Sequence, residues 1–387
     1  VPEYNAVVTG YDITNTHTPS TVNISGKKIW DDANNQDGKR PTEVVVNLLA
    51  DGQPTGQKAT VTEATNWAYE FTDLPEFKAG QKIVYTVTED SVAEYTTNIN
   101  GFDITNSYTP SKTSIRVTKA WNDNNNQDGL RPDSIKVQLY ADGQKVGAAV
   151  DVTATDNWSY TWSDLPEKAA GKIINYSVVE EDAVAGYTSA TSPLISGNVT
   201  ITNSHIPTVT QVSGKKIWDD ANNQDGKRPT EITVNLLADG IATGKKVTVT
   251  EANGWTYEFT DLPEFKDGQK IVYTVTEDSV SDYTTTYKDF DITNSYQPGK
   301  TSITVIKAWD DAKNQDGIRP DSIQVQLYAD GQKVGAAVDV TAANNWTYTW
   351  SDLDIKANGQ DIVYTVEEVG TIDGYTTTVG QLISGSV

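Results

Sequence analysis

Hydrophobic and polar residues alternate with a period of two along most of the chain. β-Branched and aromatic residues fill the apolar positions, and turn-forming residues recur about every 8–12 positions. Ala-Asp-Gly predicts hairpin turns at 50–52, 141–143, 238–240 and 329–331. Asp-Leu-Pro predicts further strand breaks at 73–75, 164–166 and 261–263. No segment keeps a helical period beyond a turn or two, so the pattern predicts an all-β protein.

A long sequence repeat divides the chain into four units. The segment GKKIWDDANNQDGKRPTE occurs at 26–43 and 214–231, and a variant with KAW and NQDG occurs at 119–135 and 307–323. The tryptophans of these segments lie 91, 97 and 91 residues apart, at Trp30, Trp121, Trp218 and Trp309. A unit of about ninety residues suits one β-sandwich. We predict domains at 20–110, 111–207, 208–298 and 299–387, joined by stiff Pro/Ser/Thr linkers into an extended rod.

One lysine shares the inward face of the first strand in every unit. Residues two apart lie on the same face of a strand. In the second unit Lys119 therefore falls on the same face as Ile115, Val117 and Trp121. The equivalent lysines are Lys28, Lys216 and Lys307, whereas the parity of Lys27 and Lys215 is outward.

Two later strands carry a polar residue at the end of an apolar face. The face with Tyr176 and Val178 ends at Glu180, and the face with Ile201 ends at Asn203. The equivalent residues are Glu89, Glu277 and Glu368, and Asn106 and Asn294. Glu181 and Glu367 are outward neighbours. We predict that the glutamate lies on the penultimate strand and the asparagine on the last strand.

The same parity predicts that aromatic residues of the middle strand lie in the core. Trp158, Tyr160 and Trp162 share one face in the second unit, as do Trp346, Tyr348 and Trp350 in the fourth. All ten tryptophans fall at repeated positions, which favours a core role over sugar stacking.

A buried charge must find a partner or become neutral. One arrangement is a buried Lys–Glu ion pair with an asparagine hydrogen bond. The other is a reaction, because burial lowers the pKa of an amine and raises that of a carboxylic acid. A neutral amine can then attack the asparagine amide while the acid shuttles protons. The product would be a Lys–Asn amide crosslink with loss of ammonia, formed once per domain rather than by enzymatic turnover.

These segments resemble the B-type repeat domains of Gram-positive collagen-binding adhesins, which also occur in sortase-assembled pilins. The resemblance rests on the W-x-D-x-x-N-Q-D-G-x-R-P segment, the Y-x-V-x-E strand and the I-T-N-S strand, and it covers nearly the whole chain. It implies prealbumin-like, inverse immunoglobulin-type sandwiches with spontaneous Lys–Asn isopeptide bonds assisted by glutamate. The implied sets are Lys28, Glu89 and Asn106; Lys119, Glu180 and Asn203; and Lys216, Glu277 and Asn294.

The two ends of the chain depart from the repeat. Residues 381–387 align with 193–199, before the asparagine strand, whereas residues 1–19 contain a detached last strand with Asn15 at the asparagine position. One explanation is an arbitrary boundary produced by cloning or proteolysis. The alternative is head-to-tail complementation, in which Lys307 bonds Asn15 of another copy.

Composition narrows the function further. The net charge of −23 argues against nucleic acid as a partner, and no segment is long and apolar enough for membrane insertion. The lack of cysteine excludes disulfides and thiolate sites, and the lack of methionine indicates a mature or excised segment. The acidic loop at 31–38 fits an Asx-rich turn better than a calcium loop. We predict no metal and no cofactor.

The sequence therefore predicts a structural stalk rather than an enzyme. We expect it on the extracellular, cell-wall-attached surface of a Gram-positive bacterium, holding a separate binding domain outward. An alternative is an adhesin module that itself contacts a host matrix protein or glycan. A hydrolytic enzyme is disfavoured, because every polar constellation belongs to the repeat.

Overall fold

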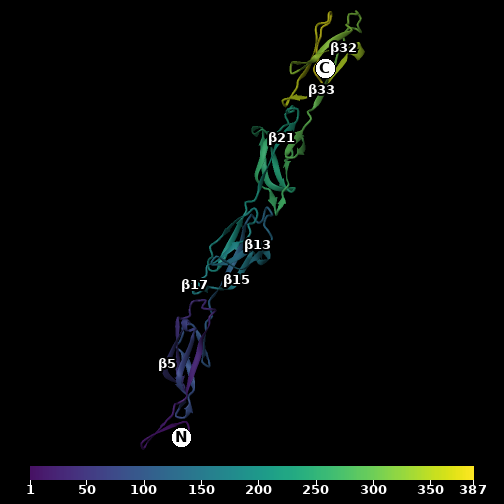
Figure 1. Cartoon of the computed structure of the whole chain (residues 1–387). Coiled ribbons are helices and arrows are strands. Elements are labelled where there is room, and N and C mark those ends of the chain that lie inside the picture. The colour runs from purple at the N-terminus through teal and green to yellow at the C-terminus, as the bar shows by residue number, and fades with distance from the viewer. The chain divides into compact units, whose positions relative to one another are not determined.

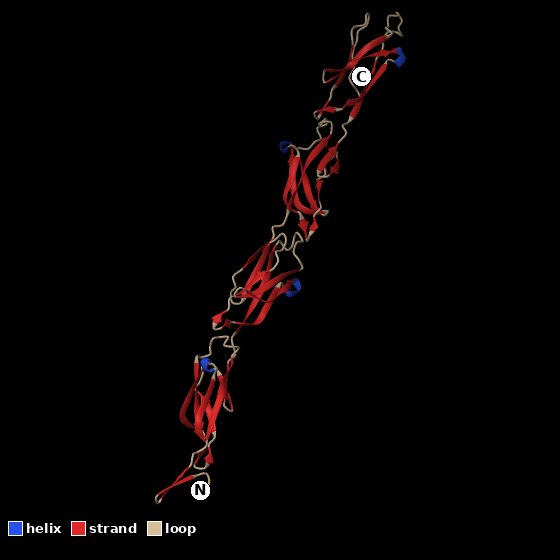
Figure 2. Ribbon diagram, viewed as in Figure 1, coloured by secondary structure: helices blue, strands red, loops and turns tan.

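The computed structural model describes all residues, 1–387, and consists of β-strands joined by turns and four short 3₁₀ turns (Figure 2). The chain forms two compact units, one of residues 1–125 and 130–206 and the other of residues 126–129 and 207–387. The first three repeats share one two-sheet arrangement and the fourth contains part of it, so the all-β prediction is confirmed (Figure 1).

The first repeat packs a four-stranded sheet against a three-stranded sheet. The strand orders are β10-β11-β3-β6 and β5-β4-β9, and the only parallel pairing joins β3 to β11. Its elements are β3 (Thr21–Asp31), β4 (Glu43–Ala50), β5 (Gln53–Thr62), η1 (Glu63–Thr65), β6 (Ala68–Pro75), β7 (Phe77–Lys78), β8 (Gln81–Lys82), β9 (Tyr85–Glu89), β10 (Thr96–Asn100) and β11 (Asp103–Ser107). A separate hairpin of β1 (Asn5–Thr9) and β2 (Asp12–Thr16) precedes them.

The second and third repeats have the same topology. The second contains β12 (Lys112–Asn122), β13 (Ser134–Ala141), β14 (Gln144–Thr153), η2 (Ala154–Asp156), β15 (Ser159–Pro166), β16 (Lys168–Ala169), β17 (Lys172–Ile173), β18 (Tyr176–Glu180), β19 (Thr188–Thr191) and β20 (Asn198–Ser204). The third contains β21 (Val209–Asp219), β22 (Glu231–Ala238), β23 (Ile241–Thr250), η3 (Glu251–Asn253), β24 (Thr256–Pro263), β25 (Phe265–Lys266), β26 (Gln269–Lys270), β27 (Tyr273–Glu277), β28 (Thr284–Lys288) and β29 (Asp291–Ser295). In each, the first strand pairs in parallel with the last.

The fourth repeat has the three-stranded sheet but only two strands of the other. Its elements are β30 (Lys300–Ile306), β31 (Ser322–Ala329), β32 (Gln332–Thr341), η4 (Ala342–Asn344), β33 (Thr347–Asp354), β34 (Lys356–Ala357), β35 (Gln360–Asp361) and β36 (Tyr364–Glu368). The segment Gly385–Val387 pairs with β30: the amides of Thr304 and Ile306 donate to the carbonyls of Gly385 and Val387, and the Val387 amide donates to the Thr304 carbonyl.

Each repeat has its own core between the sheets, filled by aliphatic side chains such as Val46, Leu48 and Ile104 of the first repeat. The predicted hairpin turns are present: Asp51 and Gly52 both have positive φ and join β4 to β5 with a two-residue loop.

The strand ends predicted at Asp-Leu-Pro are confirmed, because β6, β15 and β24 end at Pro75, Pro166 and Pro263. A bulge precedes the first of these strand ends, where Asp73 has a left-handed backbone and the register shifts. Two other predictions about the strands are wrong. The glutamate strand is not the penultimate one, because β10, β19 or β28 follows it in the first three repeats.

The second error concerns the aromatic residues of the middle strand. Tyr160 and Tyr348 are 39% and 37% exposed, whereas the equivalent Tyr69 is buried. The residue opposite explains the difference. Gly26 faces Tyr69 and leaves room for its ring, but in the second repeat Val117 faces Tyr160 and fills that space.

Candidate functional site

The lysine, glutamate and asparagine of each of the first three repeats meet between the two sheets. In the first repeat, β3 carries Lys28, the parallel neighbour β11 carries Asn106, and β9 brings Glu89 from the facing sheet. Lys28 is 3% exposed and Asn106 is fully buried. The Nζ atom of Lys28 lies 3.4 Å from Oε1 of Glu89. The neighbouring Lys27 is exposed, as its parity predicts.

The second and third repeats reproduce this arrangement. Lys119 lies 3.8 Å from Glu180, and Lys216 lies 3.3 Å from Glu277. In the second repeat, Nδ2 of Asn203 also donates a hydrogen bond of 3.0 Å to Oε1 of Glu180. One carboxylate therefore contacts both the amine and the amide.

The buried amides of the first and third repeats have unsatisfied hydrogen-bonding atoms. Neither Nδ2 nor Oδ1 of Asn106 has a hydrogen-bond partner, and the same is true of Asn294. Each unsatisfied buried group costs about 1–3 kcal/mol. A simple ion pair with an asparagine hydrogen bond therefore does not account for these two sites.

Burial changes the acidity of the three lysines. Desolvation lowers the pKa of Lys28 to about 8, and the nearby Glu89 carboxylate offsets only part of that effect. Desolvation likewise lowers the pKa of Lys119 and of Lys216 to about 8. A larger fraction of each amine is therefore neutral at neutral pH than for an exposed lysine.

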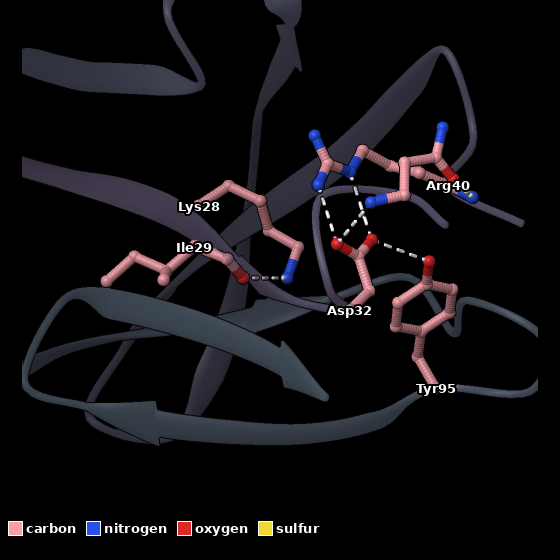
Figure 3. A network of polar contacts seen from close by, with 6 residues as sticks. Lys28, Ile29, Asp32, Arg40 and Tyr95 are labelled. Atoms are coloured by element: carbon pink, nitrogen blue, oxygen red, sulfur yellow. Dashed lines mark hydrogen bonds and ion pairs between the residues drawn. The ribbon is translucent and has the colours of Figure 1, made fainter. Parts of the chain in front are cut away.

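In each repeat a tryptophan ring contacts both the lysine and an arginine, an arrangement that the sequence analysis missed. The Trp30 ring centroid lies 4.3 Å from Nζ of Lys28 and 5.3 Å from the guanidinium of Arg40. Figure 3 shows Asp32 between Arg40 and Tyr95. The carboxylate accepts two hydrogen bonds from Arg40, at 3.1 and 2.7 Å, and one of 2.9 Å from the Tyr95 hydroxyl. An aspartate and an arginine eight residues apart recur in every repeat, and this spacing could have predicted the ion pair.

A hydroxyl from the strand that the sequence analysis overlooked contacts each glutamate. Thr97 of β10 donates a hydrogen bond of 3.1 Å to Oε2 of Glu89, and Ser189 of β19 donates one of 3.0 Å to Glu180. In Glu89 the hydroxyl contacts Oε2 and the lysine lies nearest Oε1. In Glu180 the hydroxyl and the lysine both lie at Oε2, and the asparagine amide contacts Oε1.

The fourth repeat holds the lysine and glutamate beside an open cavity. Lys307 donates a hydrogen bond of 3.0 Å to Glu368, but its side chain is 15% exposed, against 0% for Lys28. A cavity of about 700 Å³ is lined by Lys307 and Glu368 together with Trp309 and Val387. No asparagine lines this cavity. Asn15 lies on the exposed strand β2, where it pairs only with β1.

The chain is therefore a tandem array of β-sandwich domains, and the first three bury a lysine, a glutamate and an asparagine between their sheets. The chain belongs to the Cna protein B-type domain family, whose sequence model matches residues 24–107, 115–204, 212–295 and 303–386.

The chain is also similar in sequence to a collagen adhesin and to B repeat units of a collagen binding protein. The chain is 53% identical over 367 residues to a protein named collagen adhesin from Staphylococcus aureus, covering 95% of this chain and 31% of the relative. It therefore spans about a third of that protein. A crystal structure of two B repeat units of the collagen binding protein of the same organism is 52% identical, covers 95% of this chain and 98% of that chain, and has a TM-score of 0.47. No helix in the structure is long and apolar enough to cross a membrane.

Proposed function

We propose that this chain is part of the stalk of a Gram-positive surface adhesin, with three of its domains closed by internal isopeptide bonds. The observation that supports this most directly is the buried lysine, glutamate and asparagine set of the first three repeats. The similarity to a collagen adhesin supports the surface location, outside the cell and attached to its wall. We propose a structural role, with no enzymatic turnover.

The bond would form by aminolysis of the asparagine. The neutral Nζ of Lys119 attacks Cγ of Asn203, a new C–N bond forms, and Nδ2 leaves as ammonia. Glu180 contacts the amide nitrogen directly, at 3.0 Å, so it is placed to take the proton from the amine and deliver it to the leaving group. Lysine and asparagine yield one amide and one ammonia, and the glutamate is unchanged.

Such a bond would close most of each domain into a loop. The loops run from Lys28 to Asn106, from Lys119 to Asn203 and from Lys216 to Asn294. In the chain-entropy model, a crosslink over a loop of this size stabilises the fold by roughly 4 kcal/mol. Because the bonded strands are parallel neighbours, the bond also joins the strand through which the chain enters each domain to the strand through which it leaves.

Intact mass tests the bonds directly. We expect the purified chain to be lighter than its sequence by three ammonia molecules. Glu180→Gln should restore one ammonia and leave the other two bonds. The matched control is Glu181→Gln, because this neighbouring carboxylate binds Lys145 at the surface instead. A mass equal to that of the unmodified sequence would rule out the chemistry.

We also propose that the fourth repeat accepts a last strand from another copy of the chain. The cavity beside Lys307 and Glu368 lies next to the edge of β30, and the exposed β2 carries the Asp-Ile-Thr-Asn sequence that fills this position in the first and third repeats. Insertion of β2 would bring Asn15 to Lys307 of the neighbouring molecule.

Denaturing gels of concentrated protein test this complementation. We expect a ladder of covalent multimers that disappears in Lys307→Ala and in Asn15→Ala. The control Lys313→Ala removes an exposed lysine of the same domain and should leave the ladder intact. A single monomer band at high concentration would contradict strand exchange without affecting the evidence for internal bonds.

A further inference from the structure

The Asn-Gln-Asp-Gly loop of the first repeat contacts the repeat that follows it. Asp37 is 6% exposed, and its Oδ2 atom accepts hydrogen bonds from the Tyr108 hydroxyl at 2.8 Å and from the amide and hydroxyl of Ser111, both at 2.9 Å. Tyr108 and Ser111 belong to the linker between β11 and β12. One carboxylate therefore fixes both ends of the linker.

The same loop also contacts a hairpin of the second repeat. The carbonyl of Gln36 accepts a hydrogen bond of 3.0 Å from the amide of Gly171, which lies in the turn between β16 and β17. Gly38 packs so closely on Gly171 that a Cβ atom on Gly38 would lie 2.7 Å from the Gly171 Cα atom. The glycines allow backbone to pack directly on backbone.

The junction between the third and fourth repeats has the same contacts. Asp225 accepts hydrogen bonds from the Tyr296 hydroxyl at 2.7 Å and from the Gly299 amide at 3.1 Å. The Gly359 amide donates to the carbonyl of Gln224 at 3.0 Å, and a Cβ atom on Gly226 would lie 2.7 Å from the Gly359 Cα atom. The arrangement is thus repeated at a second junction.

The fourth repeat shows the loop without a neighbour. Its Asp316 is exposed, and no atom lies within 4 Å of a Cβ placed on Gly317. The loop nevertheless keeps its shape, because the Gly317 amide donates to Asn314 as the Gly38 amide does to Asn35, with φ near +67° in both glycines. The contact surface is therefore formed before docking.

We propose that the Asn-Gln-Asp-Gly loop is a clamp between domains, which holds the following repeat in a fixed orientation. The surface recognises a linker tyrosine and its nearby backbone amide through the carboxylate, and a glycine hairpin through its backbone. Relative motion is the default for adjacent domains with small interfaces. The clamp replaces it with a pair of domains that moves as one body, independently of any bond inside either domain.

The carboxylate suits this role because it is ionised over most of the pH range. Burial alone would raise the pKa of Asp37, but hydrogen bonds from the Ser111 amide, the Tyr108 hydroxyl and the Ser111 hydroxyl lower it overall. Gln36 is the other polar side chain of the loop at this carboxylate, and it also donates to the Ser111 carbonyl at 3.3 Å.

Double electron–electron resonance, which measures the distance between two spin labels, tests the clamp on the full chain. The chain has no cysteine, so Gln57→Cys in the first repeat and Gln144→Cys in the second attach two spin labels at exposed positions. We expect a narrow distance distribution in the parent and one about twofold wider in Asp37→Ala, because the linker then loses its anchor. Asp316→Ala is the matched control and should leave the distribution narrow.

A second pair of variants separates docking from backbone strain. Gly38→Ala and Gly317→Ala both place an alanine at positive φ, but only the first collides with a neighbouring domain. We expect broadening in Gly38→Ala alone, while circular dichroism shows both variants folded. Equal distributions for Asp37→Ala, Gly38→Ala and the parent, or a broad distribution in the parent itself, would overturn the proposal.

Discussion

At the scale of single residues, the buried Asp32 carboxylate depends on its ion pair with Arg40, whose guanidinium lies 5.3 Å from the Trp30 ring centroid. Asp32 is 2% exposed and would keep only Tyr95 and the amide of Asn35 as donors if Arg40 were removed. Loss of one partner of a buried ion pair costs about 3–5 kcal/mol. We therefore predict that Arg40→Ala lowers the unfolding free energy of the first repeat by about 3 kcal/mol.

Hydrogen exchange with mass spectrometry measures this effect within one domain. Peptides from β3 and β11 should lose protection in Arg40→Ala. Lys58→Ala, which removes an exposed cation from the same repeat, should leave their protection unchanged. Equal protection in both variants would show that the ion pair does not support the fold.

The pH dependence of the same ion pair follows from the pKa of Asp32. Burial alone raises that pKa, but the hydrogen bonds from Arg40, Asn35 and Tyr95 lower it overall. A carboxylate with a depressed pKa contributes stability above its unfolded pKa and loses it as the pH falls through the folded value. We predict that the first repeat begins to lose stability below about pH 4, the ordinary range of an aspartate.

Acid titration of hydrogen-exchange protection, corrected for intrinsic exchange, checks this pH dependence. Asp32→Asn should weaken the dependence of the first repeat on pH and leave the other repeats as they are. Asp73→Asn is a suitable control, because Asp73 is exposed and asparagine tolerates its left-handed backbone. An unchanged profile in Asp32→Asn would contradict the argument.

Gly26 shows how one residue distinguishes two types of repeat. A Cβ atom at this position would lie 2.0 Å from the Phe102 carbonyl oxygen and 2.7 Å from the Tyr69 hydroxyl. We predict that Gly26→Ala destabilises the first repeat by about 2 kcal/mol, as overpacking does. Gly380→Ala, where nothing lies within 4 Å, is the control. Thermal unfolding that is identical for both variants would argue against this steric role.

At the scale of strands, the binding of an added last strand to the fourth repeat can be measured with a peptide. We predict that a synthetic peptide with the sequence of residues 8–17 protects the amides of 308–310 from hydrogen exchange, because it supplies the parallel neighbour that β11 provides for the equivalent residues of the first repeat. The same peptide with alanine at Asn15 should protect these amides reversibly, without a covalent product. Unchanged exchange with either peptide would show that the cavity does not accept this strand.

Strand parity explains which features could be predicted from the sequence. The burial of Lys28 and the exposure of Lys27 follow from period two alone, because adjacent residues face opposite sides of a sheet. The exposure of Tyr160 does not, since it depends on the residue across the strand pair. The role of Asp37 was also out of reach, because its partners lie 71 and 74 residues away in the linker.

At the scale of the whole chain, the proposed isopeptide bonds and the Asn-Gln-Asp-Gly loops have different mechanical roles. The bonds bear load within domains, and the loops fix the orientation between domains. If Lys28 is bonded to Asn106, a force applied at the two ends passes through that amide, and residues 29–105 carry no load. The same holds for the second and third repeats, whose bonded strands are also parallel neighbours. The fourth repeat has no asparagine beside Lys307 and can extend.

We therefore predict a single domain-unfolding event when one molecule is stretched from its ends. The matched segment of the fourth repeat, 303–386, has 84 residues and extends to at most about 300 Å at 3.3–3.6 Å per residue. Lys119→Ala should add one event, because the second repeat then lacks its bond, whereas Glu181→Gln should add none. Four unfolding events in the unmodified chain would show that the first three domains bear load without a covalent bond. Asp37→Ala should leave the number of events unchanged, because the clamp fixes orientation between domains and does not bear the load within them.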